Sequence, residues 1–242
     1  MTTANYTAAP FAHASYALLL WDSTIQSYIN CYLLLRPPHT ILIDTGKAAE
    51  HLTPLIAILG SLGVAAEDVT HIIATHGHQD HVGAAAGFPV AERLIHAQDA
   101  PLLAETSLAQ FSLNLPDNGE VLGLRCRLLR QHTPGSVALY DPQSKAAFCG
   151  DHICFFGDPL PSDGPVSYGA GLREITYNYI HEWMHGPDRL DDDNLDRFLK
   201  GLVTLAAFEA DVLCTGHGAI LTGDIAPFLA RLQEAASAQE IR

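Results

Sequence analysis

Hydrophobic positions along the chain fall into short strand-like runs first and longer helical patterns later. Three apolar runs near the N-terminus, separated by turn residues, predict strands at 16–21, 28–35 and 40–43. The segment from Pro37 to Thr40 is typical of a hairpin connection between the last two. Apolar residues then recur at helical spacing over 48–62, and Gly63 predicts the end of that helix.

Strand and helix patterns continue to alternate over the rest of the chain. Further strands are predicted at 71–75, 93–96, 124–130, 137–141, 146–149 and 212–214. Helices are predicted to follow from Val82 and to cover 98–105, 172–184, 191–208 and 223–241, whereas 115–120 and 155–171 are predicted loops. Because no repeat or linker interrupts this order, we expect a single domain over residues 1–242.

Composition limits the possible partners. The chain has 13 Lys and Arg against 27 Asp and Glu, a formal net charge of −14, and 48% hydrophobic residues. Such a chain can bury a sizeable core. It lacks the clustered cations that bind phosphate backbones, so we expect a small-molecule substrate and no nucleic acid.

Cysteine usage and the residues near the N-terminus indicate the cellular compartment. The five Cys follow no disulfide pattern and include no CxxC, which is typical of reduced thiols. The first basic residue is Arg36, and the apolar run at 16–21 is far too short to cross a bilayer. We therefore expect a soluble cytoplasmic protein without a membrane partner.

The 13 His residues are the most informative part of the composition. The segment from Thr75 to His81, THGHQDH, places three His and one Asp directly after a predicted buried strand. Imidazole and carboxylate are good ligands for zinc and other divalent metals. Four donors in one short loop suit two metals better than one, so more donors are expected at other strand ends.

Those additional donors are present. His132 follows the strand predicted at 124–130, Asp151 follows that at 146–149, and His217 follows that at 212–214. Small or Gly neighbours accompany each of them, as in Gly216-His217-Gly218, and allow the backbone to approach a site closely.

Taken in order, THGHQDH, HTPGS, Gly150-Asp151-His152 and Gly216-His217-Gly218 resemble the metallo-β-lactamase-fold hydrolases, in particular the branch of glyoxalase II and the lactonases. The early IDTG segment, 43–46, matches as well. The resemblance covers most of the chain. It implies an α/β fold, a four-layer αβ/βα sandwich of two mixed β-sheets with outer helices, whose active site lies at strand ends along one edge.

The resemblance also implies a two-metal site. The first metal would be held by His76, His78 and His132, and the second by Asp80, His81 and His217, with Asp151 bridging both. Asp44 is expected to orient a ligand His, although a simple strand-end turn is the alternative. His152 is expected in the pocket wall rather than among the ligands.

The chemistry implied is hydrolysis of a small-molecule ester, lactone or thioester by a metal-bridging hydroxide. Asp80 is the candidate catalytic residue, which would orient the nucleophile or relay its proton. Zinc is the expected metal, with iron and manganese as alternatives. A mono-iron enzyme resembling persulfide dioxygenases and a non-catalytic metal-binding sensor remain alternative functions, and a homodimer remains open.

Differences from known branches of this family narrow the choice of function. The flavodiiron branch has Glu at the position of His78, class B β-lactamases lack the bridging Asp151, and the acyl-homoserine lactonases have Tyr at the position of Cys154. Glyoxalase II carries a further helical domain with basic residues. The nucleases of this fold need a basic surface, which the negative charge opposes.

Two features of the sequence are not part of the motifs that carry the resemblance. The region between Phe155 and Asp191 holds six aromatic residues and is predicted to form an apolar substrate pocket, although Tyr179 and Trp183 fit a core helix face equally well. Within it, His181-Glu182-Trp183-Met184-His185 matches the HExxH pattern of zinc peptidases. Because Gly186 and Pro187 end that helix and no third ligand follows, a solvated helix face is the preferred interpretation.

Overall fold

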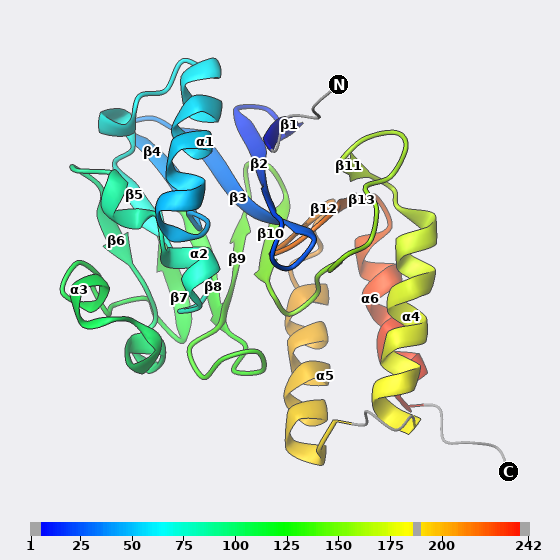
Figure 1. The fold of residues 1–242 in the computed structure, drawn as a ribbon. Helices are drawn as coiled ribbons and strands as arrows, with labels where there is room; N and C mark the ends of the chain where they lie inside the picture. Colours follow the sequence, from blue (N-terminus) through cyan, green and yellow to red (C-terminus); the bar gives the residue numbers. More distant parts are fainter. Residues whose placement is uncertain (1–5, 186–189, 238–242) are drawn as a thin grey trace, which may run out of the picture.

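Two β-sheets face each other at the centre of the molecule, and helices cover their outer sides (Figure 1). The computed structural model describes residues 6–185 and 190–237. The first sheet contains, in spatial order, β1 (Tyr6–Ala12), β2 (Ser15–Asp22), β3 (Ser27–Arg36), β4 (His39–Ile43), β5 (His71–Ile73) and β6 (Glu92–Leu94). Strands β1 to β4 pair antiparallel and β4 to β6 pair parallel, so this sheet is mixed.

The second sheet is also mixed. Its spatial order is β11 (Val166–Ser167), β13 (Ile220–Thr222), β12 (Val212–Thr215), β10 (Ala146–Gly150), β9 (Val137–Asp141), β8 (Leu124–Leu128) and β7 (Asn118–Val121). The pairs β10–β12 and β11–β13 are parallel, and the others are antiparallel. The parallel β10–β12 pair brings the carboxyl ends of these strands to one edge, where the loops that follow them meet.

Helices complete the outer layers. The first sheet packs with α1 (Ala48–Ser61), α2 (Gln79–Val82), α3 (Glu105–Leu108) and the 3₁₀ turns η1 (Ala66–Asp68) and η2 (Ala85–Gly87). A third 3₁₀ turn, η3 (Ala97–Leu102), follows β6. The second sheet packs with α4 (Ala170–His185), α5 (Asp192–Ala206) and α6 (Ile225–Ser237). The predicted αβ/βα sandwich is confirmed.

Three layers of buried apolar side chains hold the sandwich together, and the two-residue period of the strands separates them. In β2, Leu18 and Leu20 pack toward α1, whereas Ala17 and Leu19 pack between the two sheets. The layer between the sheets also contains Phe148 of the second sheet. Because both faces of β2 are buried, its sequence is a continuous apolar run, and such a run was sufficient to predict the strand.

Several predicted elements were wrong or missing. The loop predicted at 115–120 contains the start of β7, and the loop at 155–171 contains the two-residue strand β11. The helix expected to follow from Val82 instead ends there as α2 and is succeeded by η2. Strands β1 and β13 were not predicted, and the end of the predicted 223–241 helix lies outside the described residues.

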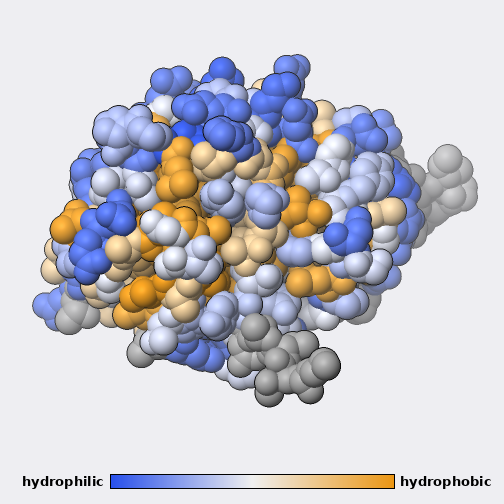
Figure 2. All heavy atoms as spheres, turned by 90° about the horizontal axis from the view of Figure 1, so that it is seen from above, coloured by the Kyte–Doolittle hydropathy of each residue, from blue (hydrophilic) through white to orange (hydrophobic). Residues whose placement is uncertain are grey.

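The surface mixes hydrophilic and apolar areas. Seen from above, hydrophilic residues line the upper rim of the visible face while apolar residues gather in its middle and lower parts (Figure 2). Scattered exposed apolar side chains are normal on folded proteins. Within residues 6–185 and 190–237, no helix combines the length and the apolar character needed to cross a bilayer.

Candidate metal centre

All seven predicted ligand residues come together where the strand ends of both sheets meet. The first sheet contributes the loop after β5, which carries His76 and His78 and continues into α2 with Asp80 and His81. The second sheet contributes the other three, which follow β8, β10 and β12: His132, Asp151 and His217. The site therefore joins the two halves of the sandwich.

Four of these residues form one group with metal-binding potential: His76, His78, His132 and Asp151. Nε2 of His132 lies 2.9 Å from Nδ1 of His78 and 3.3 Å from Oδ2 of Asp151. Donor atoms about 3.3 Å apart are what ligand bonds of about 2.0–2.1 Å to one tetrahedral ion require.

The remaining three residues form a second group: Asp80, His81 and His217. Oδ2 of Asp80 lies 3.5 Å from Nε2 of His217 and 3.7 Å from Nε2 of His81. Asp151 also reaches this group, because its Oδ1 is 3.4 Å from His81 Nε2 and its Oδ2 is 3.3 Å from His217 Nε2. The structure thus brings one carboxylate between the two groups.

The donor set fits cations better than internal hydrogen bonds. Nδ1 of His81 faces the Asp44 carboxylate at 2.9 Å, and Nδ1 of His217 faces the Tyr28 carbonyl at 3.1 Å, so each Nδ1 carries the proton of the neutral ring. When both rings are neutral, their Nε2 atoms, 3.3 Å apart, present lone pairs to each other and form no hydrogen bond. Among the described residues, Nε2 of His76 and Oδ1 of Asp151 are buried without a hydrogen-bond partner. A cation between these atoms would satisfy them.

Burial and charge shift the pKa values of this cluster. Burial acts to lower the pKa of His81, but the carboxylates of Asp151 and Asp44 outweigh it and hold that pKa well above its ordinary value. Burial and the neighbouring His81 lower the pKa of His76. Burial acts to raise the pKa of Asp151, yet His81 and His217 hold it well below the ordinary range. The centre therefore favours positive charge beside ionised Asp151, whether from protons or from metal.

Asp44 orients His81, as the sequence indicated. It directly follows β4 and is 1% exposed. Its Oδ1 accepts the backbone N–H of Thr75 at 2.7 Å, and its Oδ2 accepts the Thr75 hydroxyl at 2.8 Å and contacts His81 Nδ1. One carboxylate thus positions both the start of the THGHQDH loop and one ring in it.

His217 is held by the opposite sheet. Nδ2 of Asn30, in β3, donates to the carbonyl oxygens of Thr215 and Gly218 at 3.0 Å each. Gly216 has no side chain, and a Cβ there would lie 1.9 Å from Oδ1 of Asp151. Only glycine therefore allows this loop to lie against the carboxylate, which explains the Gly neighbours noted in the sequence.

Asp99 is a site residue that the sequence analysis missed. It lies in η3, is fully buried, and accepts three hydrogen bonds: from Gly77 N–H at 2.8 Å, Thr133 Oγ1 at 2.7 Å and Gly135 N–H at 2.6 Å. The first donor lies between His76 and His78, and the other two lie one and three residues after His132. Asp99 therefore fixes two loops that carry the first group.

We expect Asp99→Asn to weaken metal binding at the first group about 10–100-fold, because the new NH₂ would face backbone N–H donors and loosen these loops. Competition with a chromophoric chelator measures this affinity. Asp68→Asn is the matched control, since Asp68 is exposed and accepts one local bond from Ala65 N–H. Equal metal affinities for Asp99→Asn and the wild type would contradict the assignment.

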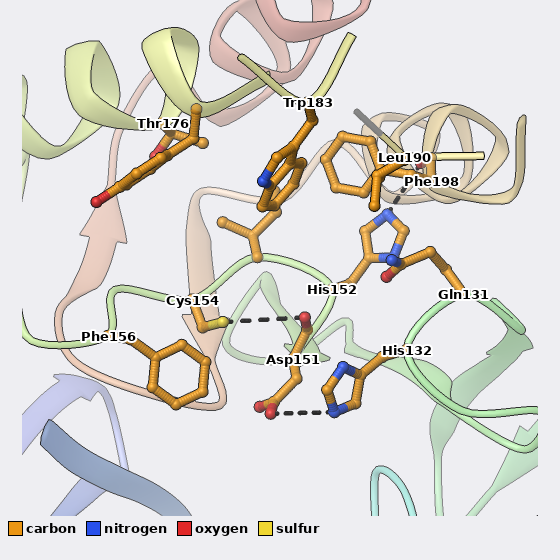
Figure 3. Close-up of a pocket in the computed structure, with 12 residues that line it drawn as sticks. Gln131, His132, Asp151, His152, Cys154, Phe156, Thr176, Trp183, Leu190 and Phe198 are labelled. Atoms are coloured by element: carbon orange, nitrogen blue, oxygen red, sulfur yellow. Dashed lines mark hydrogen bonds and ion pairs between the residues drawn. The ribbon is translucent and has the colours of Figure 1, made fainter. Parts of the chain in front are cut away.

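A cavity of about 360 Å³ opens beside the centre (Figure 3). His132 and Asp151 line one side of it, and Phe156, Tyr179 and Trp183 also contribute. The predicted aromatic pocket is thus confirmed for these three. Phe155 is buried in the core, and Tyr177 packs against that core, as Trp183 does in addition to lining the cavity.

His152 forms part of the cavity wall, as expected. Its Nε2 lies 3.0 Å from the carbonyl oxygen of Phe198, and burial lowers its pKa to about 4. Cys154 also lines the cavity, and burial together with the nearby Asp151 raises its thiol pKa well above the ordinary value. Both side chains are therefore uncharged near neutral pH.

The HExxH pattern lies on α4 and is separate from this centre. His181 and Glu182 are exposed, and neither belongs to the two groups found among the described residues. The side chains of Met184 and His185 lie outside the described residues. The exposed positions fit the preferred interpretation of a solvated helix face.

Comparisons with known proteins agree with this geometry. A model of the metallo-β-lactamase superfamily matches residues 25–97. The chain is similar to metallo-β-lactamase domain-containing protein 1 of Xenopus laevis, with 45% identity over 188 residues that cover 76% of this chain and 69% of the relative. It is also similar to hydroxyacylglutathione hydrolase of Methylobacillus flagellatus, with 26% identity over 148 residues that cover 60% of this chain and 49% of that protein.

Among solved structures, a flavodiiron protein of Thermotoga maritima superimposes with a TM-score of 0.75. The alignment covers 96% of this chain and 61% of that chain, at 18% sequence identity. Identity this low shows a common fold and leaves the chemistry open.

Proposed function

The chain belongs to the metallo-β-lactamase superfamily, and within it we propose a binuclear metallohydrolase that cleaves an ester, lactone or thioester bond of a small molecule. In this proposal His76, His78 and His132 hold one ion, and Asp80, His81 and His217 hold the other. Zinc is the proposed metal because imidazole and carboxylate donors suit it, and iron and manganese are the alternatives.

The position of Asp151 is the observation that carries the proposal. Its Oδ2 lies 3.3 Å from Nε2 of both His132 and His217, which belong to different groups. A carboxylate that reaches both groups would allow the chain to hold two ions side by side. Such a pair, when bound, supplies a water of lowered pKa and polarises the bond to be cleaved.

The chain's own residues would position the reactants. Oδ2 of Asp80 faces His217 and His81, while the side chain is 29% exposed. We assign its Oδ1 to orient the attacking water and accept its proton. Phe156 lies beside this group, with its ring centroid 4.1 Å from that of His217, and would shield the reacting bond from bulk water.

Two complete ligand groups favour a hydrolase over the mono-iron dioxygenase. The strongly negative chain also favours a small-molecule substrate over a nucleic acid. The hydroxyacylglutathione hydrolase relative keeps thioesters among the candidate substrates, but that protein is matched over only 49% of its length.

We expect about two metal ions per chain and metal-dependent turnover of at least one of the three bond classes. The test is elemental analysis of purified protein, followed by assays with alkyl and p-nitrophenyl esters, lactones and thioesters after loading with zinc, iron or manganese. About one iron per chain together with oxygen uptake would instead establish the dioxygenase. Two ions without turnover of any class would support the sensor.

A further inference from the structure

We propose that the 360 Å³ cavity beside the metal centre binds an uncharged, apolar acyl or alkyl arm of the substrate and discriminates against an arm with an anionic end. This inference rests on the proposed hydrolase function and names the substrate class more closely. It depends on three features of the cavity: its two unlike ends, the absence of Lys and Arg from the described residues that line it, and its fixed wall.

The two ends of the cavity differ in chemistry. His132 and Asp151 line the end at the metal centre, where a dashed line in Figure 3 marks the contact between their side chains. Away from them, apolar side chains dominate the wall: Ile153 of the loop after β10, Tyr179 and Trp183 of α4, Phe198 of α5, and Leu190 just before α5. A scissile carbonyl at the first end therefore directs one arm of the substrate onto apolar surface.

Neither Lys nor Arg is among the described residues that line the cavity. Two polar side chains in the wall are already engaged, because His152 Nε2 bonds to the Phe198 carbonyl and Thr176 Oγ1 donates to the Leu172 carbonyl at 2.9 Å. Against these described residues, an anionic group would lose its hydration and gain no counterion, which is unfavourable in apolar surroundings.

The apolar wall is fixed before any ligand arrives. Trp183 packs edge-on against Phe198 at 5.6 Å, and Phe198 stacks on His152 at 4.9 Å. Gly201 lets α5 approach this stack, since a Cβ there would lie 2.1 Å from Cε1 of His152. Preformed surfaces of this kind bind an apolar group without first ordering side chains.

Binding can be followed apart from catalysis, because Trp183 lines the cavity and Trp21 is the only other tryptophan in the sequence. Trp21 lies in β2 and packs on Tyr28, so Trp21→Phe leaves Trp183 as the single reporter. The probes are 2-octanone and 7-oxooctane-1-sulfonate, two ketones that cannot be hydrolysed and that differ only in the terminal sulfonate, which is a weak metal ligand.

With metal-loaded Trp21→Phe protein, we expect 2-octanone to change the Trp183 emission saturably and the sulfonate to bind at least tenfold more weakly. Equal affinities, or no saturable change with 2-octanone, would overturn the inference. In the same background, Thr176→Lys should raise the sulfonate affinity at least tenfold, whereas Thr176→Met, similar in length but neutral, should not. Failure of Thr176→Lys to do so in folded protein would also overturn it.

A series of p-nitrophenyl esters from acetate to octanoate links the cavity to turnover. We expect kcat/KM to rise about fourfold per added methylene until the cavity is filled. Turnover that does not depend on chain length would refute the cavity assignment but leave the hydrolase standing. Saturable binding of 2-octanone without hydrolysis of any ester, lactone or thioester would support the cavity assignment and refute the hydrolase.

Discussion

Asp151→Ala is expected to lower kcat/KM at least 10³-fold on any substrate that the protein turns over, and to reduce bound metal from about two ions to at most one per chain. The reason is the placement of one carboxylate against both ligand groups, 3.3 Å from His132 and from His217. Its removal takes a donor from both proposed ions at once and leaves the His cluster without its central negative charge. Loss of a bridging ligand removes several kcal/mol of transition-state stabilisation, and 1.36 kcal/mol corresponds to a factor of ten.

Elemental analysis and steady-state kinetics on the same preparations measure both effects. Asp163→Ala is a suitable control, because Asp163 lies on the same segment between β10 and α4 but is exposed. Circular dichroism would verify that both variants fold. If folded Asp151→Ala retained two ions and near-wild-type kcat/KM, the two-metal assignment would be wrong.

The cluster of candidate ligands could be predicted from the sequence because each donor follows a strand whose pattern is local. Apolar runs identify the strands before THGHQDH, Asp151 and His217, and the loops after them converge at one edge of the sandwich. Asp44 was predictable for the same reason, since it directly follows β4. The local pattern alone does not say which donors approach one another, such as His78 and His132 at 2.9 Å; the family resemblance supplied that grouping.

The features that the sequence analysis missed depend on contacts between residues that are distant in sequence. Asp99 resembles any polar residue at a helix start, and its role exists only because Gly77, Thr133 and Gly135 converge on it. Strand β1 is an edge strand paired only with β2, and it contains Pro10, which argues against a strand in sequence terms. The cavity wall likewise combines α4 with Phe198 of α5, whose proximity no local pattern predicts.

Arg36→Met is expected to lower the free energy of unfolding by about 3–5 kcal/mol at neutral pH. Arg36, at the end of β3, forms a buried ion pair with Asp141, at the end of β9, and so joins the two sheets. Arg36 Nη2 also donates to Ser15 Oγ at 2.8 Å. Removing the guanidinium would leave the Asp141 carboxylate buried without its counterion, which is far more costly than losing an exposed pair.

Arg231→Met provides the comparison, because Arg231 and Glu174 form an ion pair at 3.1 Å in which both side chains are more than half exposed. Its loss should change stability by less than about 1 kcal/mol. Urea denaturation of the three proteins in the same metal state measures both values. Similar small losses for both variants would show that the Arg36–Asp141 pair contributes no more than a surface contact.

The effect of Arg36→Met should also depend on pH in a defined direction. Burial acts to raise the pKa of Asp141, but hydrogen bonds from Ser144 and Arg36 outweigh it, so the pKa lies below its ordinary value of 3.8. A carboxyl group whose pKa is lower in the folded state stabilises the fold above the unfolded pKa, and this stabilisation is lost as pH falls through the folded value. The stability difference between wild type and Arg36→Met should therefore be largest above about pH 5 and shrink as the pH falls. It should reach its minimum below the lowered folded-state pKa of Asp141, where this carboxyl group is protonated in both proteins and no longer needs a counterion. A difference that stayed constant from pH 7 to pH 3 would mean that Arg36 acts through packing and its bonds to Ser15 and nearby carbonyls rather than through the charge of Asp141.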